Sequence, residues 1–344
     1  MLQRVTLRDI AEAAKVHYST VSLALRDHPR ISPAVRKKVK QIAEKMGYQP
    51  DPALSALNAY RKTRLPVHYQ STIAWIDNWH SPQRLRDQPT FEEYYQGAAD
   101  RARQLGYELE EFRIEDYGAS PQRVSKMLQS RGIKGLLLAP QPTSGMNLPF
   151  NYEWFSSVTF GYSLQPQVFH IVTNYQSHSM ETALKKLIEL GYKKIGLFLH
   201  ENIDEKVENA YTTTFWHFFH KHSKMVPLRP YVIKEKEHDR TSFEKWFRKA
   251  TPDVVVSIGG LSIVDWLKDM GVSVPRDVGY VRLSIANDEK YISGIYENGL
   301  LIGRTAMDFL VGMLQHGEYG FPETPIRILV EGVWKAGKTV RKQA

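Results

Sequence analysis

The feature that most constrains the fold is the stretch near the N-terminus at residues 5–25, which reads VTLRDIAEAAKVHYSTVSLAL. It contains two short amphipathic patterns separated by a break of three residues, KVH. Thr6 and Asp9 have the spacing of a capping box, so we expect the first helix to begin there and to reach about Ala14. The second helix is expected over residues 18–25. Helices this short need tertiary partners to be stable, so the pattern predicts a small unit closed by a further helix.

That further helix is predicted in the segment ISPAVRKKVKQIAEKMGY, residues 31–48. Ser32 is in the N-cap position, Pro33 is in the first turn, and Gly47 suits a left-handed stop. Three short helices with a tight turn between the first two form a helix-turn-helix unit, whose second helix enters the major groove of DNA. The buried faces are expected to consist of Ile10, Ala13, Ala14, Val21, Ala24, Leu25, Val35, Val39, Ile42 and Met46. The outward residues of the second helix would be Tyr18, Ser19, Ser22 and Leu23.

The positive charge of the chain is concentrated in the same region. Residues 1–65 contain 13 Lys and Arg but five Asp and Glu, a net charge of +8. The remaining 279 residues carry 33 basic and 32 acidic side chains, a net charge of +1. Such a focused positive field suits a polyanion such as DNA. The alternative is a charged solubility tail, and the helix signals argue against it because they indicate an ordered unit.

A further short helix is predicted after Asp51 and Pro52, which suit an N-cap and a first turn. Leu54 and Leu57 lie on one side of it. A helix of about eight residues is not stable alone in water, so it needs its copy in a dimer or DNA as a partner. A leucine from such a helix can wedge open a base step in the minor groove. The alternative interpretation is a plain linker helix.

Residues 5–57 resemble the DNA-binding headpiece and hinge of the LacI/GalR family of bacterial transcription regulators. The family pattern begins V-T-hydrophobic-x-D-[IV]-A-x-x-A-x-V-S-x-x-T-V-S, and its third helix ends in G-Y-x-P-N. The resemblance implies a homodimer that binds a near-palindromic double-stranded operator. The positions that match are Thr6, Asp9, Ala11, Ala14, Val16, Thr20, Val21, Ser22, Gly47, Tyr48 and Pro50.

Two departures from that pattern bear on the DNA contacts. His17 replaces the usual Ser or Thr cap, a change that costs about 1 kcal/mol unless the imidazole compensates. Leu23 stands where the family often has Arg or His, so we expect an apolar contact, for example with a thymine methyl, and an unusual operator. Leu57 keeps the wedge position. The residues predicted to contact DNA are Thr6, His17, Tyr18, Ser19, Thr20, Ser22, Leu23, Arg26, Arg30, Ser32, Leu54, Leu57 and Asn58.

From about residue 71 onwards, strand and helix signals alternate, as in HSMETALKKLIELGYKKIGLFL. Repeated strand–helix units predict an α/β fold with parallel sheets that carry helices on both faces and bind ligands at the carboxyl ends of the strands. The segments ALKKLIELGYKKIGLF and DMGVSVPRDVGYV resemble the family's regulatory domain. The resemblance implies a periplasmic-binding-protein-like domain with two doubly wound lobes around an effector cleft. We expect the chain to cross between the lobes near 170–175, 285–298 and 320–325.

The predicted organisation is a headpiece at 1–49, a hinge helix and linker at 50–68, and an effector-binding and dimerisation domain at 69–344. The positions that would hold sugar hydroxyls in the family are here Gly161, Glu208 or Asn209, Gly259, Gly260 and Ser284, and none carries the family's polar group.

The cleft is nevertheless expected to be rich in aromatic and amide groups, which suit a ring-shaped polar ligand such as a carbohydrate derivative. The alternative is an aromatic-filled cleft that binds nothing. We expect the segment 77–89 to cover the cleft. The predicted effector-binding residues are Asn78, Trp79, Phe91, Tyr95, Tyr162, Asn174, Tyr175, Asn209, Ser284 and Glu297.

The sequence gives little support for other classes of protein. The chain has no cysteine, which excludes disulfides and thiolate metal sites, and no apolar run near the roughly 18 residues that a membrane span needs. His217, His220 and His222 could approach a zinc ion, but Trp216 and Phe218 favour a packed helix. We find no catalytic constellation, metal site or cofactor motif. The charged N-terminus does not read as a signal peptide, so we expect a cytoplasmic protein.

We therefore expect a DNA-binding transcription regulator, not an enzyme, which is controlled by a small effector. The resemblance favours a repressor, with an activator as the alternative. A second class is a solute-binding protein of the periplasmic type without a DNA function. The basic headpiece and the absence of a signal peptide disfavour that class.

Overall fold

The computed structural model describes residues 5–25, 31–48, 71–222, 228–234 and 237–343. The chain separates into two compact units. The first comprises Met1–Gln70 with Gly312–Glu318, and the second comprises Ser71–Val311 with Tyr319–Ala344.

Within residues 5–25 and 31–48, the described part of the N-terminal region, the structure forms three helices, α1 (Leu7–Ala14), α2 (Tyr18–Leu25) and α3 (Pro33–Lys45). The predicted capping box at the start of α1 is confirmed: the Thr6 backbone N–H donates to the Asp9 carboxylate at 2.6 Å, and the Asp9 N–H donates to the Thr6 hydroxyl at 3.4 Å. The backbone N–H groups of Thr6 and Asp9, which have no partner within the helix, are thus both satisfied by side chains, and this fixes where the short helix starts.

The core of this unit lies between the three helices. The prediction that Ala13 is buried is wrong, because it is exposed and Ala11 takes its place against the core. Gly47 has a φ of +67°, which confirms the left-handed stop after α3. The buried apolar residues of the unit are Ile10, Ala11, Ala14, Val21, Ala24, Val39 and Ala43.

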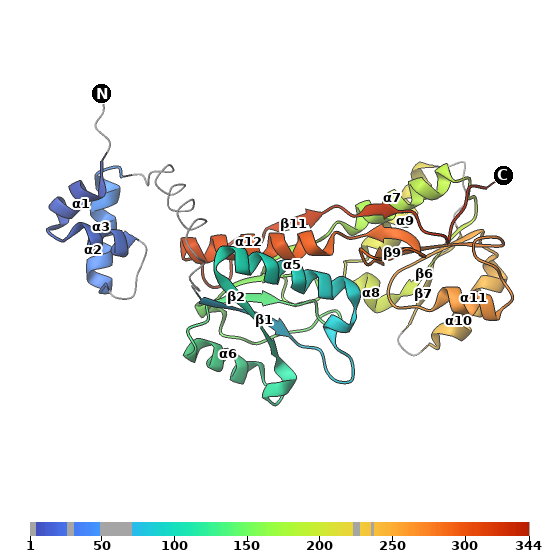
Figure 1. Cartoon of the computed structure of the whole chain (residues 1–344), viewed down its shortest axis with the longest axis horizontal. Helices are drawn as coiled ribbons and strands as arrows, with labels where there is room; N and C mark the ends of the chain where they lie inside the picture. Colours follow the sequence, from blue (N-terminus) through green and yellow to red (C-terminus); the bar gives the residue numbers. More distant parts are fainter. Residues whose placement is uncertain (1–4, 26–30, 49–70, 223–227, 235–236, 344) are drawn as a thin grey trace, which may run out of the picture. The chain divides into compact units, whose positions relative to one another are not determined.

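The described residues of the second unit form two six-stranded sheets, each flanked by helices on both faces (Figure 1). The first sheet is parallel throughout and has the order β11-β5-β4-β3-β1-β2. Helices α5 and α12 cover one face of this sheet, and α6 covers the other (Figure 1). Its elements are β1 (Ser71–Asp77), α5 (Pro89–Leu105), β2 (Tyr107–Arg113), α6 (Pro121–Ser130), β3 (Gly135–Leu138), β4 (Ser156–Thr159), β5 (His170–Asn174), α12 (Gly299–His316) and β11 (Arg327–Val330).

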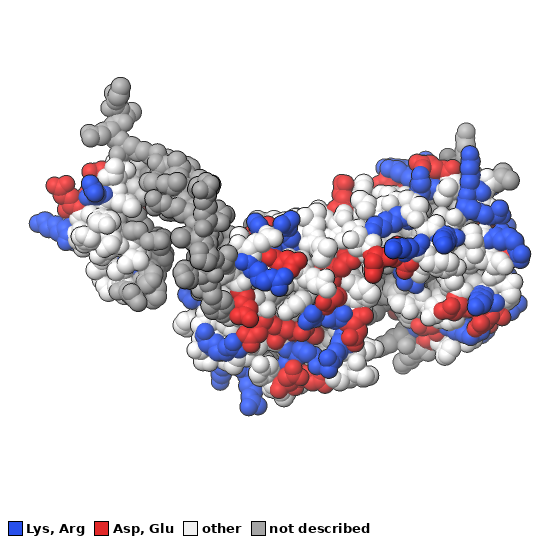
Figure 2. Space-filling view, viewed as in Figure 1, with Lys and Arg blue, Asp and Glu red and all other residues white. Residues whose placement is uncertain are grey.

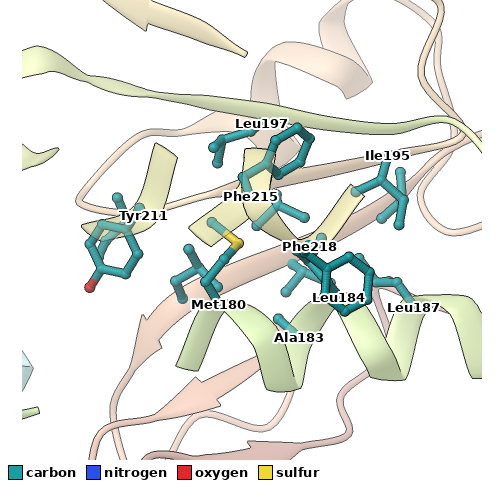
Figure 3. Close-up of a cluster of buried hydrophobic side chains, with 14 of the residues drawn as sticks. Met180, Ala183, Leu184, Leu187, Ile195, Leu197, Tyr211, Phe215 and Phe218 are labelled. Atoms are coloured by element: carbon teal, nitrogen blue, oxygen red, sulfur yellow. The ribbon is translucent and has the colours of Figure 1, made fainter. Parts of the chain in front are cut away.

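The second sheet has the order β12-β10-β9-β8-β6-β7 and is parallel except for β12, which runs antiparallel to β10. Figure 3 shows its larger core, where α7 and α9 pack their apolar side chains on β6. Aromatic residues of α10 pack on the opposite face around Phe198. The elements are α7 (Gln176–Glu189), β6 (Ile195–His200), α8 (Glu201–Glu205), α9 (Ala210–Lys221), β7 (Tyr231–Ile233), α10 (Asp239–Ala250), β8 (Val254–Ser257), α11 (Ile263–Asp269), β9 (Gly279–Ile285), β10 (Ser293–Tyr296) and β12 (Val333–Lys335).

The chain passes three times between the two sheets, after β5, after β10 and after β11. The first two crossings fall where we predicted them. The third prediction, 320–325, is wrong, because that segment precedes β11 and the chain crosses only at residues 331–332. Hydrogen bonds join the crossings: the Tyr175 N–H donates to the Val330 carbonyl at 2.8 Å, and the Asn298 amide donates to the Glu331 carbonyl at 2.7 Å.

Helices α5 and α12 approach each other at glycines. A Cβ on Gly303 would lie 1.9 Å from the Tyr94 carbonyl oxygen, and one on Gly97 would lie 2.1 Å from the Leu300 carbonyl oxygen. Only glycine permits backbones this close, so these two positions set the spacing of the two helices.

Candidate functional site

Helix α2 has a side-chain cap that the sequence left open. The backbone N–H of Ser19 donates to the His17 Nδ1 atom at 3.4 Å, and the Ser19 hydroxyl lies 2.7 Å from the same nitrogen. The imidazole therefore accepts a hydrogen bond from the first turn of α2, as a Ser or Thr hydroxyl would. This contact compensates in part for the replacement of the usual Ser or Thr cap.

The start of α2 presents its side chains outside the closed core. Tyr18 is 52% exposed, and its ring centroid lies 4.5 Å from that of His17. His17 and Ser19 are also exposed, whereas Thr20 and Leu23 are half-buried. Of the predicted base-reading residues, the structure thus exposes Tyr18 and Ser19, whereas Leu23 is half-buried.

The other predicted DNA contacts fall into two groups. Thr6 and Ser32 are exposed N-caps of α1 and α3, and the Ser32 hydroxyl accepts from the Val35 N–H at 3.5 Å. Capped helix N-termini with exposed hydroxyls are suited to phosphate contacts. The side chain of Ser22 and the residues Arg26, Arg30, Leu54, Leu57 and Asn58 lie outside the described part of the chain.

Figure 2 shows that charges of both signs are interspersed over the second unit. A patch of one sign large enough to grip a polyanion is therefore not visible on this face of the unit. The concentration of basic residues is a property of the N-terminal region, as the sequence predicts.

We call the first sheet with its helices the first lobe, and the second sheet with its helices the second lobe. The second candidate site is a cavity of about 1300 Å³ between the two sheets, which we call the interlobe cavity. Residues that follow β1, β3, β4, β6, β8 and β9 line it, as expected for ligand sites at the carboxyl ends of parallel strands. Five predicted effector residues are on its wall: Trp79, Phe91, Tyr162, Ser284 and Glu297.

One side of the interlobe cavity is a row of aromatic rings from the first lobe. Ring centroids are 6.4 Å apart for Trp79 and Phe91, 5.8 Å for Phe91 and Tyr94, and 5.5 Å for Tyr94 and Phe160. The Trp79 indole N–H donates to the Pro140 carbonyl at 2.7 Å, which holds the ring in place. A fixed aromatic surface of this kind suits a flat or ring-shaped ligand.

Polar contacts at the base of the interlobe cavity join the two lobes. The Tyr94 hydroxyl on α5 donates to the Glu297 carboxylate at 2.9 Å. The hydroxyls of Thr90 and Ser284 lie 3.1 Å apart. Glu297 is buried, and its burial raises the pKa of that carboxyl above the usual range. Both contacts link α5 of the first lobe to residues at the ends of strands β9 and β10 in the second lobe.

The other five predicted effector residues lie outside the lining. The Asn78 amide donates to Gln141 at 3.0 Å, and the Tyr95 ring packs on Trp75 and beneath the Arg86 guanidinium. The remaining three are Asn174, whose amide donates to the Val330 carbonyl at the crossing, Tyr175, which stacks on His178, and Asn209, which has a left-handed backbone before α9.

Several wall residues were missed by the sequence reasoning, notably Lys206, Tyr211 and Arg282. Lys206 caps the C-terminus of the five-residue helix α8, which directly follows β6. The sequence does show that Lys206 follows a predicted strand, which places it near a ligand site. It does not show which side chain of that segment points into the cavity. The segment 77–89 was expected to cover the cleft, and its members on the wall are Trp79, Pro82, Gln83, Arg84, Asp87, Gln88 and Pro89.

Two further findings concern other classes of site. Within the described ranges, His, Asp and Glu side chains form no cluster of three suited to a metal ion. Among the helices that the structure describes, none combines the length and apolar character needed to cross a membrane.

Comparison with known proteins agrees with this architecture. Residues 6–51 match the family of bacterial regulatory proteins called the lacI family. Catabolite control protein A of Priestia megaterium is 21% identical over 284 residues, 80% of each chain. The HTH-type transcriptional repressor MelR of Bacillus subtilis (strain 168) is 23% identical over 310 residues, 84% of each chain.

Solved structures share the whole fold. The lac repressor dimer bound to operator and the anti-inducer ONPF has a TM-score of 0.58 at 15% identity, and covers 98% of this chain and 99% of its own. The complex of the transcriptional regulator CelR with cellobiose has a TM-score of 0.60 at 19% identity, and covers 98% and 100%. The predicted fold class, a helix-turn-helix headpiece with a two-lobed α/β domain of mostly parallel sheets, is therefore confirmed.

Proposed function

We propose that this chain, a member of the LacI/GalR family of bacterial transcription regulators, is a homodimeric repressor of a near-palindromic operator that responds to a small organic effector. The observation that carries the DNA-binding part is α2, an ordered and capped helix whose first residues are exposed within a region of net charge +8. Because the similar protein MelR is a repressor, we favour repression for this chain, with activation as the alternative.

The proposal assigns DNA reading to residues 1–49, minor-groove insertion to the hinge at 50–68, and effector binding and dimerisation to 69–344. Tyr18 and Ser19 would read base edges in the major groove, while the exposed caps and Lys side chains of the headpiece would contact phosphates. In a symmetric dimer two such headpieces would read half-sites about one helical turn apart.

The effector would act on the angle between the lobes. The interlobe cavity is bounded by both lobes, and the hydrogen bond from Tyr94 to Glu297 joins them at its base. A ligand that favours one lobe angle would change the spacing of the paired hinges, with a coupling free energy of about 1–3 kcal/mol. The aromatic row, and the cellobiose held by the structurally similar CelR, support a carbohydrate-like ligand.

A cytoplasmic location belongs to this proposal, because its ligand is chromosomal DNA. A periplasmic-type solute-binding protein would share the two lobes but has no use for a basic helix-turn-helix unit. Catalysis is not part of the proposal, since the similar proteins are transcription regulators.

The test is selection of random duplexes by the full chain, followed by titration of the selected site. We expect a near-palindromic consensus and a loss of about fivefold or more in specific affinity for Tyr18→Ala, because a base contact contributes about 1–3 kcal/mol. The matched control is Gln41→Ala, an exposed residue on α3 that should bind as the parent does. Selection without any consensus, or equal losses for both variants, would contradict the assignment.

A further inference from the structure

Lys206 joins the two lobes across the interlobe cavity. It is the C-cap of α8 in the second lobe, and its backbone N–H donates to the Asn202 carbonyl at 3.1 Å. Its side chain reaches the first lobe, where the Nζ atom lies 5.6 Å from the ring centroid of Trp79. Trp79 is buried and fixed, so the ammonium group is held over an aromatic face at the edge of the cavity.

The ammonium group of Lys206 has no hydrogen bond and no ion pair within the described part of the chain. Burial alone lowers the pKa of this amine to about 8, and no carboxylate acts to raise it. This holds although five carboxylates lie on the same wall, at Asp87, Glu201, Glu205, Glu289 and Glu297. A partly desolvated cation without a counter-charge is unfavourable unless a ligand supplies that charge.

The other basic residues of the wall differ from Lys206 in this respect. The Arg282 guanidinium donates to the Tyr280 hydroxyl and the Leu261 carbonyl, each at 3.4 Å, and it helps to lower the pKa of Glu289. The His200 Nε2 atom lies 3.1 Å from the Asp239 carboxylate. Arg84 is exposed to solvent. Lys206 is therefore the wall cation, among the described residues, whose charge is both desolvated and uncompensated.

We propose that the interlobe cavity takes a ring-shaped organic anion, whose carboxylate or phosphate group pairs with Lys206 while its ring packs on the aromatic row that begins at Trp79. The inference rests on the proposed function, because it takes this cavity as the effector site. The volume of about 1300 Å³ leaves ample room for one or two sugar rings with a charged substituent. A sugar acid and a sugar phosphate share the required chemistry.

Such an anion would also bridge the two lobes. Lys206 belongs to the second lobe and Trp79 to the first, so a ligand that touches both bridges the lobes. A neutral sugar could pack on the ring but would leave the ammonium group unpaired, and it would gain less from closure.

The experiment compares charged ligands with their neutral parents on the full-length protein. Galacturonate and glucose 6-phosphate are each paired with galactose and glucose, within a wider panel of sugar acids, sugar phosphates and parent sugars. Thermal shift and calorimetry at pH 7 measure stabilisation and affinity. The variants are Lys206→Met, which removes the charge at similar length, and Lys206→Arg, which keeps it. The matched control is Lys249→Met, on an exposed lysine of α10 away from the cavity.

We expect at least one anion to bind the parent protein more tightly than its neutral parent by tenfold or more. Lys206→Met should remove that preference, Lys206→Arg should retain part of it, and Lys249→Met should leave it unchanged. Preference for sugar acids over phosphates, or the reverse, identifies the source of the anionic group.

The inference is overturned if no charged member of the panel stabilises the parent protein beyond its neutral counterpart, or if the preference survives Lys206→Met. Operator binding is measured separately on the same variants. If the ligand test fails while the parent protein still binds its operator, only the proposal of an anionic effector is overturned. If the parent protein does not bind an operator, the proposed function itself is overturned.

Discussion

Replacing Lys206 by methionine should make the ligand-free protein more stable at neutral pH. Burial lowers the pKa of Lys206 from 10.5 to about 8, so the folded state holds this charge less readily than the unfolded state does. At about 1.4 kcal/mol per pKa unit the full shift corresponds to about 3 kcal/mol. The side chain remains partly accessible to solvent, so we expect a gain of about 1–3 kcal/mol.

The direction in which stability changes with pH follows from the number of protons bound in the folded and the unfolded state. Between pH 8 and 10.5 the unfolded Lys206 is protonated while the folded one is largely neutral, so the parent protein gains stability as pH rises through this range. The penalty is fully present below pH 8 and is lost towards pH 10.5. The advantage of Lys206→Met should therefore be largest near pH 7 and should shrink as the pH approaches 10.5.

Thermal unfolding over a pH series measures this difference. A gain of about 1–3 kcal/mol corresponds to a rise in Tm of about 2–8 °C for a domain of this size. Lys249→Met provides the control, since it removes an exposed charge from α10 and should leave Tm nearly unchanged. A variant that is less stable than the parent at pH 7, or a difference that does not vary with pH, would refute the reasoning.

The remaining predictions concern packing and DNA. Gly303→Ala should destabilise the protein by about 1–3 kcal/mol in denaturant titration, because its methyl group would meet the Tyr94 carbonyl, whereas Gly312→Ala on the same helix has open space and should be neutral or slightly stabilising. Leu57→Ala should reduce DNA bending, measured by fluorescence transfer across the operator, and weaken specific binding by at most a few kcal/mol; unchanged bending would rule out the wedge. Leu23→Arg should move the preferred half-site base in a random-duplex selection, and an unaltered preference would place Leu23 away from the bases.

The headpiece could be predicted in detail because its signals are local. Thr6, Asp9, Pro33 and Gly47 act on the residues immediately around them, and each has the predicted role in the structure. Ala13 is the exception, since both it and Ala11 fit a helical stripe and the choice depends on how the helices pack.

The cavity was predictable only in part, because strand ends locate a site but do not show which side chains enter it. Trp79 follows β1 and Ser284 lies at the end of β9, and both line the cavity. Asn174 also ends a strand, but its amide is used to hold the crossing to Val330, a contact between residues 156 positions apart. Lys206 was missed because its significance depends on Trp79 in the other lobe.

The central claim, that the basic three-helix unit reads a duplex under control of the interlobe cavity, is tested most directly by one titration. The full-length protein is titrated against its selected duplex and a scrambled duplex over a salt series, with and without the ligand found by thermal shift. We predict preference for the selected duplex at moderate salt, a linear fall of log affinity with log salt, and a ligand-dependent change in the specific affinity of about fivefold or more. Equal affinity for both duplexes at moderate ionic strength would contradict the account.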